Sequence, residues 1–223
     1  FLHSEPSNYK GTYEQIIAAT NSHPKVHYSI VTLNYDRIPE MVSEFIHRHM
    51  QLETQFDFVR EPGAPPTYLN SSGLAPALAK LHGSTDSRVI VPPTWNKSLN
   101  NDISPAWRLA HERLAEATQI RIIGYSLPIA DAYVKYLLKS AVIKDPHLKR
   151  IDVICRDSTG LVEERYEQFM KFNFFKFVNA NVTYYLQAHV KQYERASSSY
   201  NPIAGFAINR LEEAHTNFMQ SAS

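Results

Sequence analysis

Polar side chains with catalytic potential follow separate apolar segments of this sequence. Thr32, Asn34 and Asp36 end a β-branched run that begins at Ser29, and His82 follows a second apolar segment. An amide, a carboxylate and an imidazole can together orient water, bind a polar ligand and transfer a proton. Histidine suits the last task because its unperturbed pKa is about 6.5.

Two further polar groups follow apolar segments in the second half of the chain. Gly124 and Ser126 come after the run 120–123, and Asp157 comes after the run 151–155. Open α/β sheets hold their ligands at the carboxyl ends of parallel strands. We therefore expect all these polar groups to converge on one ligand crevice.

Each candidate also has a purely structural explanation. Asp36 suits the N-cap of a following helix, Asn34 suits a turn, and His82 beside a glycine could be an ordinary loop histidine. Gly124 could serve only a strand-to-helix turn, and Asp131 favours a positive helix N-terminus with or without a ligand. The placement of the residues together, rather than any one of them, favours a functional site.

Composition narrows the class of protein. The chain has 223 residues, of which 43% are hydrophobic and 20% charged, so one large core is possible. The formal net charge of +1 and the lack of a Lys/Arg cluster give no support to nucleic-acid binding. No apolar stretch approaches the roughly 20 residues that span a bilayer. The single cysteine, Cys155, can form no internal disulfide, and we expect it to pack in the core of a cytoplasmic protein.

Alternating strand and helix patterns place the candidate residues. Strands are expected from Ser29 and at 56–60, 78–81, 89–91, 120–123 and 151–155. Helices are expected at 12–20, from Ile38, from Ser104 as N-cap with Pro105 in the first turn, and at 134–142, 162–169 and 203–218. This alternation predicts an α/β fold, with a Rossmann-like, mainly parallel sheet and helices on both faces.

The end of the chain has a different pattern. The aromatic and β-branched segment 172–187 predicts one or two strands, and 179–181 could be the turn of a hairpin. A Ser-rich stretch, 196–201, precedes a final amphipathic helix that must bury its apolar face, by default on this chain and otherwise on a partner. We expect a Rossmann-type domain over 1–194 and a linker with an amphipathic helix over 195–223.

The candidate residues belong to a series of short motifs that resembles a known family. In chain order the motifs are Thr32-Leu33-Asn34-Tyr35-Asp36, Lys80-Leu81-His82-Gly83-Ser84, Pro92-Pro93-Thr94-Trp95-Asn96-Lys97, and Gly124-Tyr125-Ser126-Leu127-Pro128 with Asp131. Their order and spacing resemble the sirtuin-like domain of bacterial NAD-consuming proteins. The resemblance extends roughly from Tyr28 to Ser158.

The resemblance implies an NAD pocket that needs no metal. Asn34 would position the nicotinamide ribose and the attacking water, and His82 would act as general base. Asp36 would bind the nicotinamide carboxamide, while Gly124 and Ser126 would lie near the phosphates and the adenosine ribose. The expected cofactor-binding set is completed by Thr32, Asp131 and Asp157.

The same resemblance indicates which reaction to expect. Protein-deacetylating sirtuins carry a four-cysteine zinc module between the histidine and glycine-serine motifs, whereas this chain has one cysteine. The resemblance therefore implies NAD hydrolysis or ADP-ribosyl chemistry rather than deacylation. Of these we expect NAD hydrolysis, and we expect the chain to be the effector module of an antiphage defence protein. A homo-oligomer or a fused sensor domain would be its partner.

One family motif is not found in the sequence. The family begins with a strand and a Gly-Ala-Gly-x-Ser loop that cradles the cofactor phosphates, and we expect this segment upstream of Phe1. A non-catalytic nucleotide-binding or assembly module with the same fold is the alternative function. An NAD-dependent protein deacylase is the third.

Overall fold

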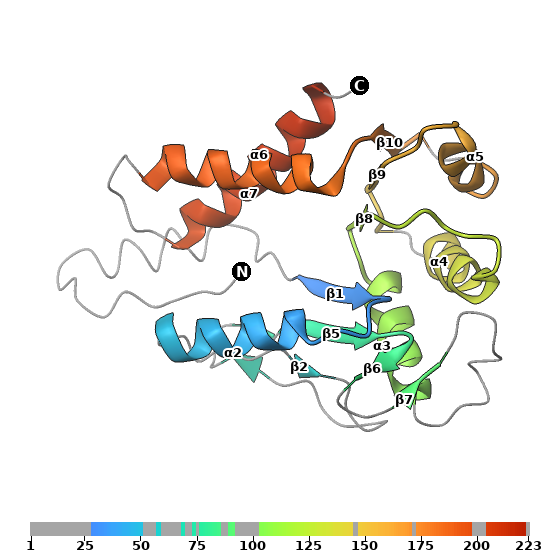
Figure 1. Ribbon diagram of the computed structural model, residues 1–223, viewed down its shortest axis with the longest axis horizontal. Coiled ribbons are helices and arrows are strands. Elements are labelled where there is room, and N and C mark those ends of the chain that lie inside the picture. Colours follow the sequence, from blue (N-terminus) through green and yellow to red (C-terminus); the bar gives the residue numbers. More distant parts are fainter. Residues whose placement is uncertain are drawn as a thin grey trace.

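The computed structural model describes ten parts of the chain, and its strands fall into two parallel sheets and two short antiparallel pairs (Figure 1). The described residues are 28–50, 57–58, 68–69, 73–74, 76–85, 89–91, 103–144, 147–170, 173–197 and 204–221.

The first parallel sheet carries the amino-terminal candidate residues. Its strand order is β1-β5-β2, with β1 at Ser29–Thr32, β5 at Ala77–Lys80 and β2 at Asp57–Phe58. Thr32 lies opposite Lys80 in the parallel register, so the two strands end together. Helix α2, Ile38–Met50, follows β1 after a short turn, as the sequence predicts.

The second parallel sheet has the order β10-β9-β8. Its strands are β8 at Gln119–Ile123, β9 at Arg150–Cys155 and β10 at Phe175–Asn179. The central strand β9 is buried along almost its whole length, including Cys155, which was expected in the core. The residues of β9 are mostly apolar, as is typical of a parallel strand that is covered on both faces, and the exception at its centre is the buried Asp152.

Helices cover both faces of this second sheet. Helices α4 (Ala132–Lys144) and α5 (Leu161–Glu167) lie on one side, and α6 (Val182–Ser197) and α7 (Ala204–Ser221) on the other (Figure 1). Val153 packs with the first pair, whereas Ile154 packs with residues of the second pair, because successive side chains of a strand point to opposite faces. The expected Rossmann-like α/β fold is confirmed.

The two sheets share one hydrophobic core, although no strand pairing is described between them. Ala79 and Leu81 belong to the same buried cluster as Ile120 and Ile122 of β8. Helix α3, Ser104–Ala115, reinforces this core, and the indole of Trp107 donates to the carbonyl of Leu81 at 2.8 Å. The candidate residues on both sheets can therefore lie on one structural unit.

A second link between the sheets comes from α7. Its Glu212 carboxylate accepts hydrogen bonds from Tyr28, just before β1, and from Arg121 in β8. The carboxyl-terminal helix is thus docked on this chain, which was the default expectation for its apolar face.

Short antiparallel pairs complete the described strands. Strands β3 (Tyr68–Leu69) and β4 (Gly73–Leu74) form one antiparallel pair between β2 and β5 in the sequence. Strands β6 (Gly83–Ser84) and β7 (Val89–Ile90) pair immediately after His82.

Two sequence predictions are wrong. The segment after Asn179 is not the second strand of a hairpin but the start of α6. In the first turn of α6, the Thr183 amide donates a hydrogen bond to the Asn181 side-chain oxygen at 2.9 Å. This cap and the burial of Tyr185 outweigh the strand preference of β-branched and aromatic residues. At α3, the N-cap is Ile103 rather than Ser104. The Ile103 side chain makes no capping hydrogen bond, and its burial in the core fixes the start of the helix.

Some expected features lie outside the described residues. These are the helix at 12–20, the motif at 92–97 and most of the Ser-rich linker, although α6 continues to Ser197. No helix in the described part of the chain is long and apolar enough to cross a membrane.

Candidate functional site

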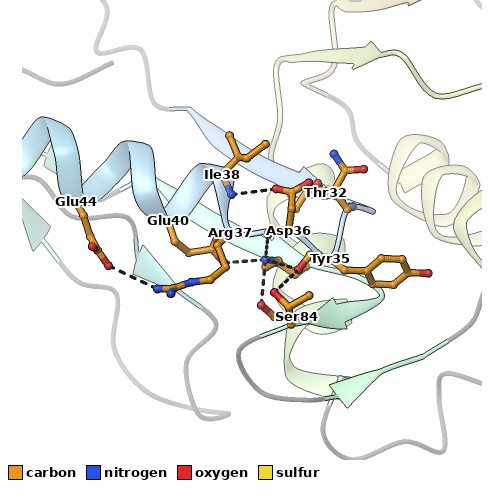
Figure 2. A network of polar contacts seen from close by, with 11 residues as sticks. Thr32, Tyr35, Asp36, Arg37, Ile38, Glu40, Glu44 and Ser84 are labelled. Atoms are coloured by element: carbon orange, nitrogen blue, oxygen red, sulfur yellow. Dashed lines mark hydrogen bonds and ion pairs between the residues drawn. The ribbon is translucent and has the colours of Figure 1, made fainter.

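The turn between β1 and α2 is shaped by two of the candidate residues themselves. The hydroxyl of Thr32 accepts a hydrogen bond from the Asn34 amide at 3.1 Å. The Asp36 carboxylate accepts one from the Ile38 amide at 3.0 Å, as a helix N-cap does (Figure 2). The Asn34 residue is exposed between these two points, so its side-chain amide is accessible from solvent.

A buried lysine lies beneath this turn. The Lys80 ammonium donates to Glu40 at 2.8 Å, to the hydroxyl of Ser84 at 3.1 Å, and to the backbone carbonyls of Tyr35 and Asp36. Figure 2 shows these acceptors around one nitrogen atom, the Lys80 ammonium, which lies between the β1–α2 turn and Ser84. The first two candidate motifs are therefore directly connected.

His82 follows β5 and is buried. Only 3% of the residue is exposed, and its carbonyl accepts a hydrogen bond from the Val91 amide at 2.9 Å. Gly83 has a φ of +87°, a backbone conformation that favours glycine, and it turns the chain immediately after the histidine. The ring of Tyr35 stands edge-on to the imidazole with 5.9 Å between centroids.

Asp131, from the other half of the molecule, approaches this histidine. Its Oδ2 lies 3.5 Å from Nε2 of His82 and accepts a hydrogen bond from the Tyr125 hydroxyl at 2.9 Å. Burial first, and then the Asp131 charge, raise the pKa of Tyr125 far above its ordinary value, so it remains a donor. A half-buried tyrosine, a buried carboxylate and a buried imidazole thus form one chain of polar contacts.

The turn that carries Tyr125 and Asp131 is held in place by several contacts. The amide of Gly124 donates to the carbonyl of Ile154 at 2.8 Å, and the hydroxyl of Tyr166 donates to the carbonyl of Tyr125 at 2.8 Å. Ser126 contributes its carbonyl, which accepts from the Arg165 guanidinium at 3.2 Å. These contacts fix the segment whose glycine and serine were expected to lie near the cofactor.

Leu127 adds an unusual backbone conformation to this turn. Its φ is +49°, which side chains with a β-carbon rarely adopt, yet only 2% of the residue is exposed. Strained residues of this kind persist only where the surrounding structure holds them. Here the buried leucine side chain anchors the turn in the core.

Asp157 has a different role from the other candidates. Its carboxylate accepts hydrogen bonds from the backbone amides of Thr159, Gly160, Val162 and Glu163, and so caps helix α5. Burial disfavours the charged form, but these donors outweigh it and lower the pKa of Asp157 below its ordinary value of 3.8. Among the expected residues from different segments, the structure brings His82 and Asp131 into contact, whereas the Asp157 carboxylate binds the backbone amides of its own helix.

Sequence reasoning missed several residues of the site. It gave no role to Lys80 or Tyr125 and did not pair Asp131 with His82. A signal for Lys80 was available, because it is the one charged residue in the buried strand Ala77–Lys80. Its partner Glu40 lies on α2, which no local pattern could reveal.

Metal chemistry has no visible support in this part of the molecule. Among the described residues, no three His, Cys, Asp or Glu side chains gather in a way that could hold a metal ion.

No family model, curated protein or solved structure matches this chain.

Proposed function

We propose that this chain is a sirtuin-like NAD hydrolase module that cleaves the nicotinamide–ribose bond to nicotinamide and ADP-ribose. The observation that carries the proposal is the buried contact between His82 and Asp131, at 3.5 Å. It joins two motifs that are far apart in the sequence, beside the turn that exposes Asn34. Such convergence of titratable groups from several strand ends is typical of a catalytic site.

The proposed reaction uses these groups in defined roles. The bond between the nicotinamide nitrogen and the ribose carbon breaks, nicotinamide leaves, and a water oxygen positioned by Asn34 bonds to that carbon. His82 accepts the proton that this water loses, and the Asp131 carboxylate stabilises the resulting imidazolium. Because His82 is buried, the surrounding loops must admit the substrate, and the Tyr35 ring is one group that would move.

The remaining expected ligands are assigned by their places in the motifs. Thr32 and Asp36 would border the nicotinamide side of the pocket, while Gly124 and Ser126 would border the phosphates. We further propose a cytoplasmic defence effector that acts as an oligomer or together with a sensor domain.

Nicotinamide release from NAD tests the proposal. The full-length protein is incubated with NAD, and free nicotinamide is separated by chromatography and quantified. We expect release by the natural protein, its loss in His82→Ala and Asn34→Ala, and its retention in Glu44→Gln, which changes an exposed residue of α2. If the natural protein releases no more nicotinamide than the two alanine variants, the proposed function is wrong.

A non-catalytic nucleotide-binding module is the second candidate. The commitment of the Asp36 and Asp157 carboxylates to helix capping favours it, because both were expected to contact the cofactor. Calorimetric binding of ADP-ribose without NAD turnover would support this function. Nicotinamide release that depends on an acylated peptide would instead support the third candidate, a protein deacylase.

A further inference from the structure

We propose that Lys80 is a positioning residue that holds the turn bearing Asn34 in register with the segment bearing His82. The expected effect of Lys80 on NAD turnover rests on the proposed function. Its attachment of the Asn34 turn to the His82 segment does not depend on that function.

The Lys80 ammonium lies between three segments. It reaches Glu40 on α2 at 2.8 Å and Ser84, two residues beyond His82, at 3.1 Å. It also reaches the backbone carbonyls of Tyr35, at 3.5 Å, and Asp36. A single cation thus fixes the backbone on one side of the site to the segment that follows the histidine.

Stability alone gives no reason for this arrangement. Lys80 and Glu40 are 8% and 9% exposed, and Oε2 of Glu40 is buried with no hydrogen-bond partner among the residues that the structure describes. The cost of removing two charges from water often exceeds the energy of their pairing, and apolar replacements of such pairs are often neutral or stabilising. We therefore infer that Lys80 contributes by fixing the backbone of the segments that it contacts, rather than by adding stability.

That geometry is the path of the β1–α2 turn. The turn lies beyond the ladder of β1 and β5, where few regular backbone bonds remain. The carbonyl of Tyr35, which Lys80 reaches, also accepts from the amide and the hydroxyl of Thr85 at 3.1 and 3.2 Å. Asn34 is the residue before Tyr35, so a shift of this carbonyl moves Asn34 relative to His82.

A nearby ion pair provides a matched control. Arg37 and Glu44 lie on the same turn and helix, 3.8 Å apart, but their side chains are 47% and 50% exposed. Exposed pairs of this kind contribute little, because water and salt screen them. Glu44→Gln therefore changes the charge of α2 without altering the buried contacts.

The experiment compares Lys80→Met, Glu40→Gln and Glu44→Gln in the full-length protein. Hydrogen exchange of the Thr85 amide reports the attachment of the turn, and the Ile151 amide in β9, bonded to Phe174 at 3.0 Å, reports global folding. Nicotinamide release gives kcat and KM for the same variants.

We expect Lys80→Met to accelerate exchange at Thr85 and leave Ile151 unchanged. Its kcat should fall by on the order of tenfold or more with little change in KM, since small displacements of catalytic groups slow a reaction strongly. Glu40→Gln should have a smaller effect, because an amide oxygen still accepts from the ammonium and the carbonyl contacts remain. Glu44→Gln should match the natural protein.

The outcomes separate this inference from the proposed function. Unchanged Thr85 exchange in folded Lys80→Met overturns the positioning role, whether or not the protein cleaves NAD. If Lys80→Met does not fold, the double variant with Glu40→Gln replaces it, because that variant leaves no unpaired buried carboxylate. Failure of both variants to fold would show a structural role and also overturn the inference. If the natural protein does not cleave NAD, the proposed function is wrong, and the exchange data still decide the role of Lys80.

Discussion

His82 illustrates how a long-range partner changes the chemistry open to a residue. In the sequence it is a histidine before a glycine, which is most often an ordinary loop residue. In the structure it is buried and faces Asp131, from a turn almost fifty positions later in the chain. A carboxylate in that position can orient an imidazole and stabilise its protonated form.

Asp131→Asn tests this role. Asparagine keeps the size of the side chain but loses the charge that would stabilise an imidazolium, so we expect nicotinamide release to fall by about tenfold or more. Tyr125→Phe, which removes only the hydrogen bond to Asp131, should have a smaller effect. Equal activity of Asp131→Asn and the natural protein would contradict a role for the carboxylate in the reaction.

Asp157 provides a residue-scale prediction that concerns stability. Its folded pKa is lowered, so its contribution to the free energy of unfolding is complete above the unfolded value of about 3.8 and is lost as the pH falls through the lower, folded value. Asp157→Asn should therefore be less stable than the natural protein at pH 7, and the difference should shrink in strongly acidic solution. Urea unfolding at several pH values measures it. A difference that does not change with pH would show that the charge is unimportant.

The sequence predicts those helices and strands whose structure is decided by the local spacing of apolar residues. The β-branched run at Ser29 and the apolar run of β9 form strands, and the apolar spacing after Ile38 forms a helix. At α6 the local residue types favour a strand, but Asn181 caps a helix and Tyr185 packs against α7. Tertiary contacts decide such segments, and they are not visible in a single sequence.

A buried histidine of helix α7 links this helix to both β9 and α6. His215 is fully buried, with its ring nitrogens 2.8 Å from the Asp152 carboxylate and 3.0 Å from the Tyr185 hydroxyl. His215→Ala should lower the free energy of unfolding by about 2–4 kcal/mol, because it opens a cavity and removes one buried hydrogen bond from each of Asp152 and Tyr185. Urea unfolding would measure the change. Gln220→Ala, on an exposed position of the same helix, should have almost no effect, and equal losses in the two variants would contradict the assignment.

On the scale of the whole molecule, the site depends on how the two parallel sheets are joined. The residue types at the strand ends were readable from the sequence. Which groups meet was not readable, because it requires the order of the strands and the shared core around Leu81 and Ile122. For this reason the pairs Lys80–Glu40 and His82–Asp131 emerge only in three dimensions.

The turn after β8 connects this site to the opposite face of the second sheet. Gly124 has a φ of +73°, and a β-carbon added there would lie 2.9 Å from Cγ2 of Val182, at the start of α6. Gly160 has a nearly equal φ of +78°, but an added β-carbon would meet nothing within 4 Å. The two glycines therefore differ in steric contact while sharing the same backbone conformation.

Gly124→Ala and Gly160→Ala use this difference. Both variants should lose about 1–2 kcal/mol of stability, since a residue with a β-carbon is strained at positive φ. Gly124→Ala should lose more and should also reduce nicotinamide release, because relief of the clash with Val182 displaces the turn that carries Asp131. Urea unfolding and the nicotinamide assay measure the two effects. If both variants lose the same stability and keep full activity, the contact between this turn and α6 has no influence on the site.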